Sequence, residues 1–167
     1  MNSRRLFLIT SLAAGCFAVS AASLQINNPN RIHQVSKLQV AKVTAAGHTI
    51  SAWLADDEGK NQEGMMFLTD KEVKENQGML FLVPRIQTAD QYHAFWMHNT
   101  FIPLDIIYID KDQKVVSIAH GKIKNDTPLV AAKPYFYVLE VKAGVAAKYG
   151  IKPGTKFAIP SSLKANY

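Results

Sequence analysis

A short segment of the chain combines polar side chains with aromatic ones. Asn99, Thr100 and Asp105 follow closely after Trp96. An aromatic platform with amide, hydroxyl and carboxylate partners is typical of a site for a sugar-like or other small polar ligand, and Trp96 or Phe81 is expected to form its floor. The structural alternative is that Asn99 and Thr100 hold a turn together while Asp105 accepts backbone N–H groups. The residue types alone leave both interpretations open.

Glu140 is a further candidate for ligand binding, because it lies inside the apolar segment 137–141. The two-residue period of a strand puts its side chain on the face opposite to Leu139, where it points either to solvent or into a cleft. If Glu140 approached Asp105 to within about 5–9.5 Å, the two carboxyl groups could share the acid and base roles of an envelope hydrolase. A solvated or salt-bridged glutamate is the simpler alternative. The sequence therefore does not decide whether the protein is an enzyme.

A second alternative function is copper handling. Met65, Met66, Met79 and Met97 are four of the five methionines, and His98 adjoins the last of them. Thioethers favour Cu(I), but methionine also fills irregular cores, and these positions lie in apolar runs. No histidine pair has the spacing of a zinc site, so we expect no resident metal and no cofactor.

Residues 1–22 have the pattern of an export signal peptide. Arg4 and Arg5 precede the apolar run 6–19, which is followed by the small residues 20–22. The run is shorter than the roughly 20 apolar residues that cross a bilayer, so we expect cleavage and no permanent membrane span. The paired arginines resemble a twin-arginine signal, although a general signal peptide fits as well. The predicted location is periplasmic or otherwise extracytoplasmic.

Cys16 is the only cysteine and lies within this leader. It is a minor candidate for a lipid anchor, because the preceding residues 13–15 resemble a lipoprotein processing box. Cleavage after residue 22 would leave a chain without disulfides, thiol nucleophiles or thiolate metal ligands.

The charge pattern argues against a nucleic-acid partner. The net charge is +6, from 19 Lys and Arg against 13 Asp and Glu, but the lysines are scattered and form no basic stripe. The expected partner is therefore a small polar ligand or a cell-envelope component, and not a nucleic acid.

The remaining chain reads as one mainly β domain. The apolar fraction of 48% suits a globular core. Thr69 and Glu72 form a capping-box pattern that predicts a helix ending before Gly78, and residues 143–149 predict one or two helical turns. Short apolar or alternating segments predict strands at 38–44, 49–55, 79–83, 93–97, 104–109, 115–120, 135–142 and 156–160, with Pro84 ending the third.

These elements favour a compact β-sandwich or barrel-like single domain with one or two short helices, and a minor α+β character. The expected organisation is an export signal peptide at 1–22, a polar linker at 23–37, the β domain at 38–160 and a C-terminal tail at 161–167.

Several motifs resemble domain-of-unknown-function family 192, in the order in which that family carries them. The resemblance covers nearly the whole β domain and implies a compact β-rich fold, found mostly in prokaryotes and often behind an export signal, with no established activity. Leu68, His98 and Thr155 depart from the residues usual in the family at these positions. The motifs are EGMMF at 63–67, GMLF at 78–81, FWMHNTFIPLDIIYID at 95–110, YVLEV at 137–141, and the glycine-containing pairs near 144, 150 and 154.

Overall fold

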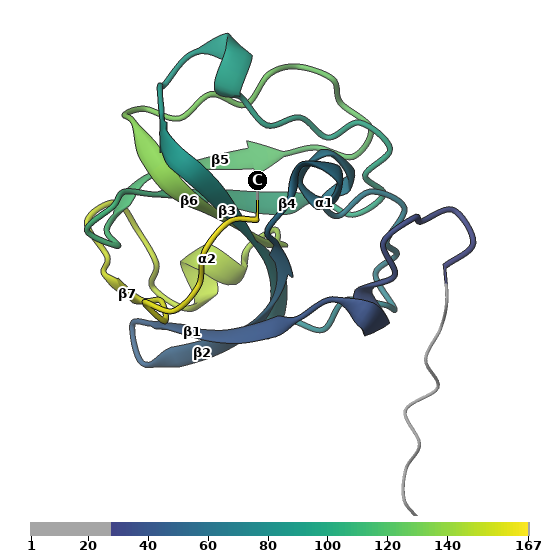
Figure 1. The fold of residues 1–167 in the computed structure, drawn as a ribbon, viewed down its shortest axis with the longest axis horizontal. Helices are drawn as coiled ribbons and strands as arrows, with labels where there is room; N and C mark the ends of the chain where they lie inside the picture. Colours follow the sequence, from purple (N-terminus) through teal and green to yellow (C-terminus); the bar gives the residue numbers. More distant parts are fainter. Residues whose placement is uncertain (1–27, 167) are drawn as a thin grey trace, which may run out of the picture.

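The computed structural model describes residues 28–166, so the predicted signal peptide and Cys16 lie outside the described residues. Figure 1 shows strands that curl around a short helix, with a second short helix against the outside of the sheet. The strands are β1 (Val40–Ala45), β2 (His48–Ala55), β3 (Gln77–Gln87), β4 (Leu104–Ile109), β5 (Val115–Gly121), β6 (Tyr135–Lys142) and β7 (Phe157–Ala158). The helices are α1 (Glu58–Glu63), α2 (Val145–Lys148) and the single 3-10 turns η1 (Val35–Lys37) and η2 (Gln91–His93).

All seven strands belong to one sheet with the order β5-β4-β6-β3-β2-β1-β7. The neighbours are antiparallel except for β2 and β3, which run parallel because the segment containing α1 carries the chain back to the starting edge. An isolated bridge between Lys114 and Lys156 brings the end of the sheet at β5 close to β7. The sheet is thus curled into a half-barrel, which confirms the predicted mainly β, barrel-like fold.

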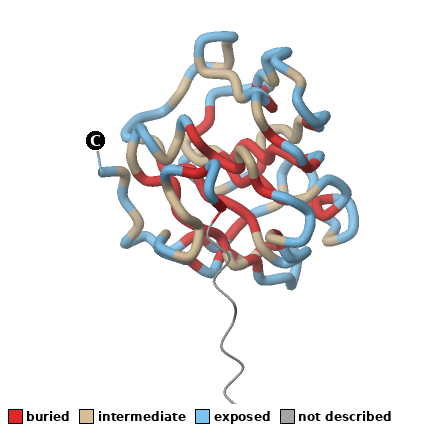
Figure 2. Tube along the Cα trace, turned by 90° about the vertical axis from the view of Figure 1, so that its right-hand side faces the viewer, coloured by how far each residue is buried: buried red, intermediate tan, exposed pale blue. Residues whose placement is uncertain are grey.

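The curl creates one apolar core on each face of the sheet. The inner core includes Ile107 and Leu139 and is closed by α2, whereas the outer core includes Ile106 and Val138 and is covered by α1 and by long loops. All six residues of β4 are buried, because side chains on both of its faces are covered. Figure 2 shows the resulting band of buried chain through the middle of the molecule.

The strands predicted at 104–109, 115–120 and 135–142 are confirmed, whereas the predicted end of β3 and the predicted strand at 93–97 are wrong. β4 and β6 have the predicted bounds, and β5 extends by one residue to Gly121. β3 continues past Pro84, because a register irregularity between Leu82 and Gln87 removes the need for a ladder bond from the proline nitrogen. The segment 93–97 is not a strand and is bridged only through Phe95, to Leu129.

The predicted helix after Thr69 is also absent among the described residues. Its capping contacts do form, since Glu72 Oε2 accepts hydrogen bonds from the backbone N–H of Thr69 at 2.8 Å and from its hydroxyl at 2.7 Å. These contacts close a single turn. The other carboxylate oxygen, Glu72 Oε1, accepts a hydrogen bond from the Asn28 side-chain amide at 3.2 Å. A helix occurs earlier, as α1, and Asp57 caps it by accepting the Lys60 N–H at 2.9 Å.

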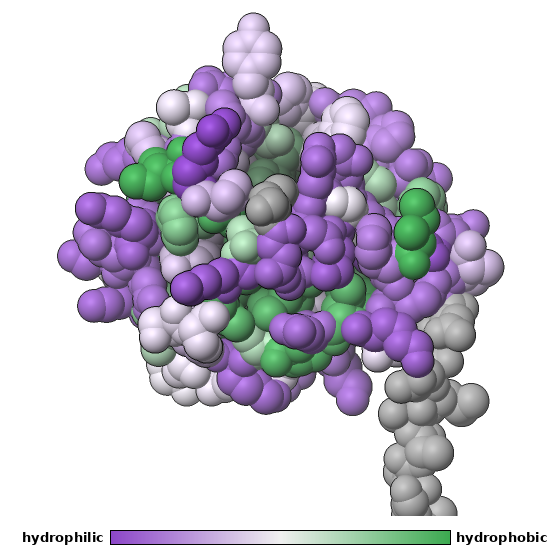
Figure 3. All heavy atoms as spheres, viewed as in Figure 1, coloured by the Kyte–Doolittle hydropathy of each residue, from purple (hydrophilic) through white to green (hydrophobic). Residues whose placement is uncertain are grey.

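The described part of the polar segment, residues 28–37, differs from a free tether. Asn28 and Arg31 are buried against the domain. Among residues 28–166, no helix is both long and apolar enough to span a membrane. Figure 3 shows a surface with hydrophilic residues over most of the face in view and smaller apolar areas between them.

Candidate functional site

The candidate site is built around Glu140 on the outer face of β6. Its neighbours across the sheet are Met79 on β3 and Ile106 on β4, so the carboxyl group rises from the middle of an apolar surface. The residue is only 4% exposed. Burial raises the pKa of Glu140 to about 8, although a hydrogen bond from the Met65 backbone N–H and the charge of Arg31 oppose the shift.

The loop after α1 lies directly over this carboxyl group, and Gly64 allows it to do so. Gly64 has φ 49°, and a Cβ at this position would lie 3.2 Å from the Phe81 ring and 3.8 Å from Glu140 Oε2. Gly78 allows a second close approach, because a Cβ there would lie 2.3 Å from the carbonyl oxygen of Glu140. These glycines let the loop and β3 approach β6 closely enough to enclose the carboxyl group.

Arg31 holds the same loop from the N-terminal side. Its buried guanidinium donates hydrogen bonds to the carbonyl oxygens of Gly64 at 2.9 Å and Met66 at 2.5 Å, and its Nε donates to the His33 carbonyl at 3.1 Å. Burial lowers the pKa of Arg31, and the nearby carboxylates oppose that shift. The guanidinium therefore satisfies loop carbonyls that would otherwise lack partners.

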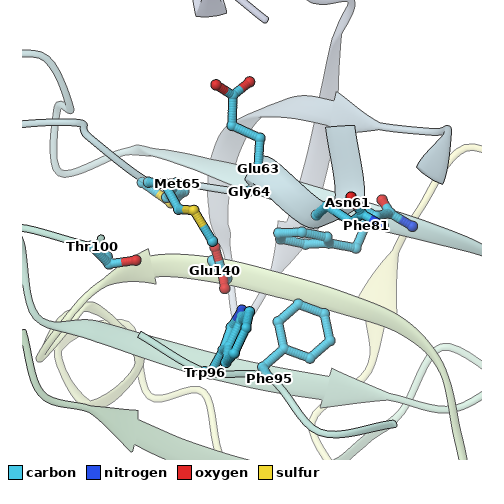
Figure 4. Close-up of a pocket in the computed structure, with 11 residues that line it drawn as sticks. Asn61, Glu63, Gly64, Met65, Phe81, Phe95, Trp96, Thr100 and Glu140 are labelled. Atoms are coloured by element: carbon cyan, nitrogen blue, oxygen red, sulfur yellow. The ribbon is translucent and has the colours of Figure 1, made fainter. Parts of the chain in front are cut away.

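Glu63, the last residue of α1, binds the same N-terminal segment as a second charged partner. Its carboxylate accepts hydrogen bonds from the backbone N–H groups of Ile32 and His33, both at 2.8 Å, and lies 3.5 Å from the Arg31 guanidinium. In Figure 4 its carboxylate points away from Glu140. Residues 31–33 and the loop after α1 are thus bound to each other through both their backbones and their charges.

A small recess lies in front of the Glu140 carboxyl group. It has a volume of about 30 Å³, enough for a water-sized group. Figure 4 shows Glu140 between Met65 and Trp96, with Thr100 at one side. The walls include Met65, Phe81, Phe95, Trp96 and Thr100.

The recess adjoins a larger cleft of about 760 Å³. Asn61, Gln62, Met66, Phe95 and Trp96 line both spaces. The cleft continues between α1 and the far end of β3 and is also lined by Arg85, Tyr92, His93 and Tyr135. A ligand of ordinary size could therefore lie in the cleft and place one small group in the recess.

The structure brings three of the predicted site residues together. Trp96, Thr100 and Glu140 all line the recess. Asn99 lies beside them in a turn, with φ 51° and its carbonyl accepting the Phe67 N–H at 2.8 Å. This arrangement supports the turn interpretation for Asn99, whereas the hydroxyl of Thr100 is available at the recess wall.

Asp105 lies elsewhere. Its side chain is on the inner face of the sheet, since Asp105 pairs with Val141 while Glu140 pairs with Ile106. Its Oδ2 accepts hydrogen bonds from the backbone N–H groups of Gly144 at 2.9 Å and Ala146 at 3.0 Å, at the start of α2. The acid and base pair required for the alternative hydrolase therefore does not form, because the two carboxyl groups lie on opposite faces.

Three of the four methionines considered for copper binding are core residues. Met65, Met79 and Met97 are buried in the outer apolar core, and only Met66 lines the cleft. The Nδ1 atom of His98 lies 2.9 Å from Asp126, and the imidazole stacks on Trp96. The three buried methionines therefore occupy the positions of core-filling residues.

Several residues of the site were not predicted from the sequence. Arg31 lies in the expected linker and Phe95 in an expected strand. The amides Asn61 and Gln62 were not singled out by any motif. A usable signal was Gly64 in the EGMMF motif, because glycine is the residue that most easily allows a backbone to approach another group closely.

Comparison with known proteins gives a family but no activity. No curated protein matches the chain. A crystal structure of a protein of unknown function from Novosphingobium aromaticivorans DSM 12444 is 40% identical, covers 77% of this chain and 91% of that one, and superposes with a TM-score of 0.63. A second, from Sinorhizobium meliloti 1021 and described as a proposed transcription regulator, is 25% identical, covers 73% and 95%, and has a TM-score of 0.66. The family model of DUF192, described as an uncharacterized ACR, matches residues 41–159, and the chain belongs to this family.

Proposed function

We propose that this protein is an exported binding protein that holds a small polar ligand, sugar-like or derived from the cell envelope, in the cleft that ends at Glu140. The observation that carries the proposal is the junction of a ligand-sized cleft with a recess that ends in a buried carboxyl group. Ligand sites typically have volumes of about 300–1,000 Å³ and combine apolar walls with a few polar groups.

The side chains that line the cleft support this proposal. Trp96 is 52% exposed and Tyr92 is 85% exposed, so both present large aromatic surfaces in the cleft. Asn61 and Gln62 add amide groups, and Arg85 adds a positive charge. Sugar rings pack on exposed aromatic faces while amides bind their hydroxyl groups.

The proposal of export rests on residues 1–22 alone. Their arginine pair, apolar run and small residues are typical of a signal peptide. An envelope location would expose the cleft to cell-wall fragments and to sugars that enter the compartment.

Thermal unfolding of the full chain against neutral sugars, amino sugars and cell-wall fragments tests the binding proposal. A ligand that binds the folded state raises the midpoint, and at a hundredfold excess over its dissociation constant it adds about 2.7 kcal/mol. We expect Trp96→Ala to remove the shift while leaving the unliganded midpoint nearly unchanged.

The matched control is Ile123→Ala, which truncates another exposed side chain that does not line the cleft. It should keep the full shift. The proposal fails if no compound in the panel raises the midpoint, or if Trp96→Ala responds as strongly as the wild type.

A further inference from the structure

We propose that the cleft selects ligands with a primary ammonium group, which enters the recess and pairs with Glu140. This inference rests on the proposed function and names the chemical class of its ligand. The charge balance, the size and the walls of the recess support it in separate ways.

Among residues 28–166, the carboxyl groups near the recess outnumber the arginine cation that they share. The Arg31 guanidinium interacts electrostatically with Glu63, Glu72 and Glu140. Its hydrogen bonds go to loop carbonyls, and the carboxylate 3.5 Å away from it is that of Glu63. Glu140 therefore feels the arginine charge without a described direct contact, and a ligand cation could supply one.

Within the described part of the chain, the other groups that interact with Glu140 carry no positive charge. Tyr108 on β4 is buried and its pKa is raised, chiefly by burial and also by the charges of Tyr135 and Glu140. The hydrogen bond that the structure shows at the Glu140 carboxyl comes from the Met65 backbone on the loop after α1. Burial of a carboxyl group with so little compensation keeps it protonated near neutral pH.

The recess has the size and the partners that an ammonium group needs. A volume of about 30 Å³ admits a water-sized –NH3+ group but not a trimethylated one. An ammonium group has three N–H donors. The Glu140 carboxylate can accept one, and the Thr100 hydroxyl can accept another, because its own proton is directed to the His98 carbonyl at 3.2 Å.

Aromatic walls favour the same class of ligand. Phe81, Phe95 and Trp96 surround the recess, and Phe81 and Phe95 meet edge to face with ring centroids 4.9 Å apart. The electron-rich faces of such rings attract cations, and tryptophan does so most strongly. A neutral hydroxyl group would not gain this attraction.

Binding would release a proton, because Glu140 must ionise to pair with the ammonium group. The protonated carboxyl group loses H⁺ to solvent, and the resulting carboxylate binds R–NH3+ without any change in the ligand. With a Glu140 pKa of about 8, affinity should rise about tenfold per pH unit between pH 6 and pH 7 and flatten above pH 8.

Isothermal titration of the full chain tests the inference with matched probes. Nα-acetyl-lysine carries a side-chain ammonium group that stays charged through this range, since its pKa is about 10.4, and Nα,Nε-diacetyl-lysine lacks that charge. We expect at least a tenfold preference for the charged probe and release of about one proton at pH 7, measured in buffers of different ionisation enthalpy.

A second pair, glucosamine and N-acetylglucosamine at pH 6.5, distinguishes an amino sugar from a lysine-type side chain as the source of the ammonium group. Glu140→Gln should lower the affinity for the better amine at least tenfold. A preference for the acetylated probes, binding without proton release, or unchanged amine affinity in Glu140→Gln would each overturn the inference. If neutral sugars bind in these cases, the proposed function stands; if nothing binds, both fail.

Discussion

Two buried carboxyl groups lie on opposite faces of the sheet in neighbouring strands, and their surroundings differ. Asp105 is 1% exposed and Glu140 is 4% exposed. Asp105 accepts two backbone N–H groups and lies 2.9 Å from the His120 imidazole. Glu140 accepts one backbone N–H group, from Met65, and faces a recess.

The difference shows how to separate a structural acid from a candidate binding acid. The hydrogen bonds of Asp105 hold α2 against the sheet, so its carboxylate is occupied by groups of the protein itself. Glu140 accepts a single backbone N–H group, and burial raises its pKa. Its carboxyl group can therefore accept further hydrogen bonds from a group in the recess. Perturbed groups of this kind are concentrated at functional sites, although ion-pair networks also produce them.

The largest expected effect is on the pH dependence of stability, through Glu140→Gln. The folded-state pKa of about 8 lies above the ordinary value of 4.5, so the unfolded chain releases this proton first as pH rises. Wild-type stability should therefore fall by roughly 4 kcal/mol between pH 4.5 and pH 8, and the glutamine variant should lack this loss. Urea unfolding of both proteins at pH 5 and pH 8 measures it.

Asp105 supplies the control for this experiment. Asp105→Asn should keep the wild-type loss of stability between pH 5 and pH 8, since Glu140 is intact. Parallel curves for wild type and Glu140→Gln would show that Glu140 ionises normally, and its distinction from Asp105 would disappear.

The next largest effect is expected from Arg31→Met, which keeps the apolar stem and removes the guanidinium. The carbonyls of Gly64 and Met66 would lose their donor, and Glu63 would lose its cation. We expect a loss of about 3 kcal/mol in the free energy of unfolding at pH 7. Chemical unfolding measures it, and Ile32→Ala is the control, because the neighbouring Ile32 side chain is exposed.

Arg31→Met also tests how far the arginine charge sets the pKa of Glu140. The Arg31 charge lowers the pKa of Glu140 against the effect of burial, so its removal should raise that pKa further. Titration of the Glu140 carboxyl group by NMR would show this. An unchanged Glu140 pKa would mean that Arg31 acts only on the loop.

The central fold could be predicted from sequence because its signals are local. The strand at 104–109 is apolar except for Asp105, and both of its faces are buried, which removes any need for alternation. α1 could not be predicted in this way, since Glu63 is its only buried residue and six residues are too short for an amphipathic period.

Only part of the site could be predicted from the sequence. Trp96, Thr100 and Glu140 were marked as candidates by residue type, but their assembly with Arg31 depends on contacts between distant segments. Asp105 was grouped with them because it is close in sequence, and the strand register placed it on the other face. Arg31 lies outside the family match at 41–159, so family resemblance did not reveal it either.

A moderate effect is expected from Asp105→Ala. This change leaves the N–H groups of Gly144 and Ala146 without their acceptor and should cost about 2 kcal/mol in the free energy of unfolding. Asp105→Asn keeps an oxygen for both donors and should cost less than about 1 kcal/mol. Equal losses in the two variants would show that the charge of Asp105, and not its acceptor geometry, stabilises α2.

The smallest effect is expected from His120→Ala. The imidazole lies 2.9 Å from Asp105, but its side chain is 78% exposed, and exposed ion pairs contribute little. Because Asp105 Oδ2 is already bound by two backbone donors, removal of His120 should cost less than about 0.5 kcal/mol at pH 7. Thermal unfolding at low and high salt measures this loss and its screening. A loss above about 1.5 kcal/mol would show that Asp105 depends on the imidazole. Asp105 would then differ less from Glu140, because its backbone hydrogen bonds alone would not satisfy it.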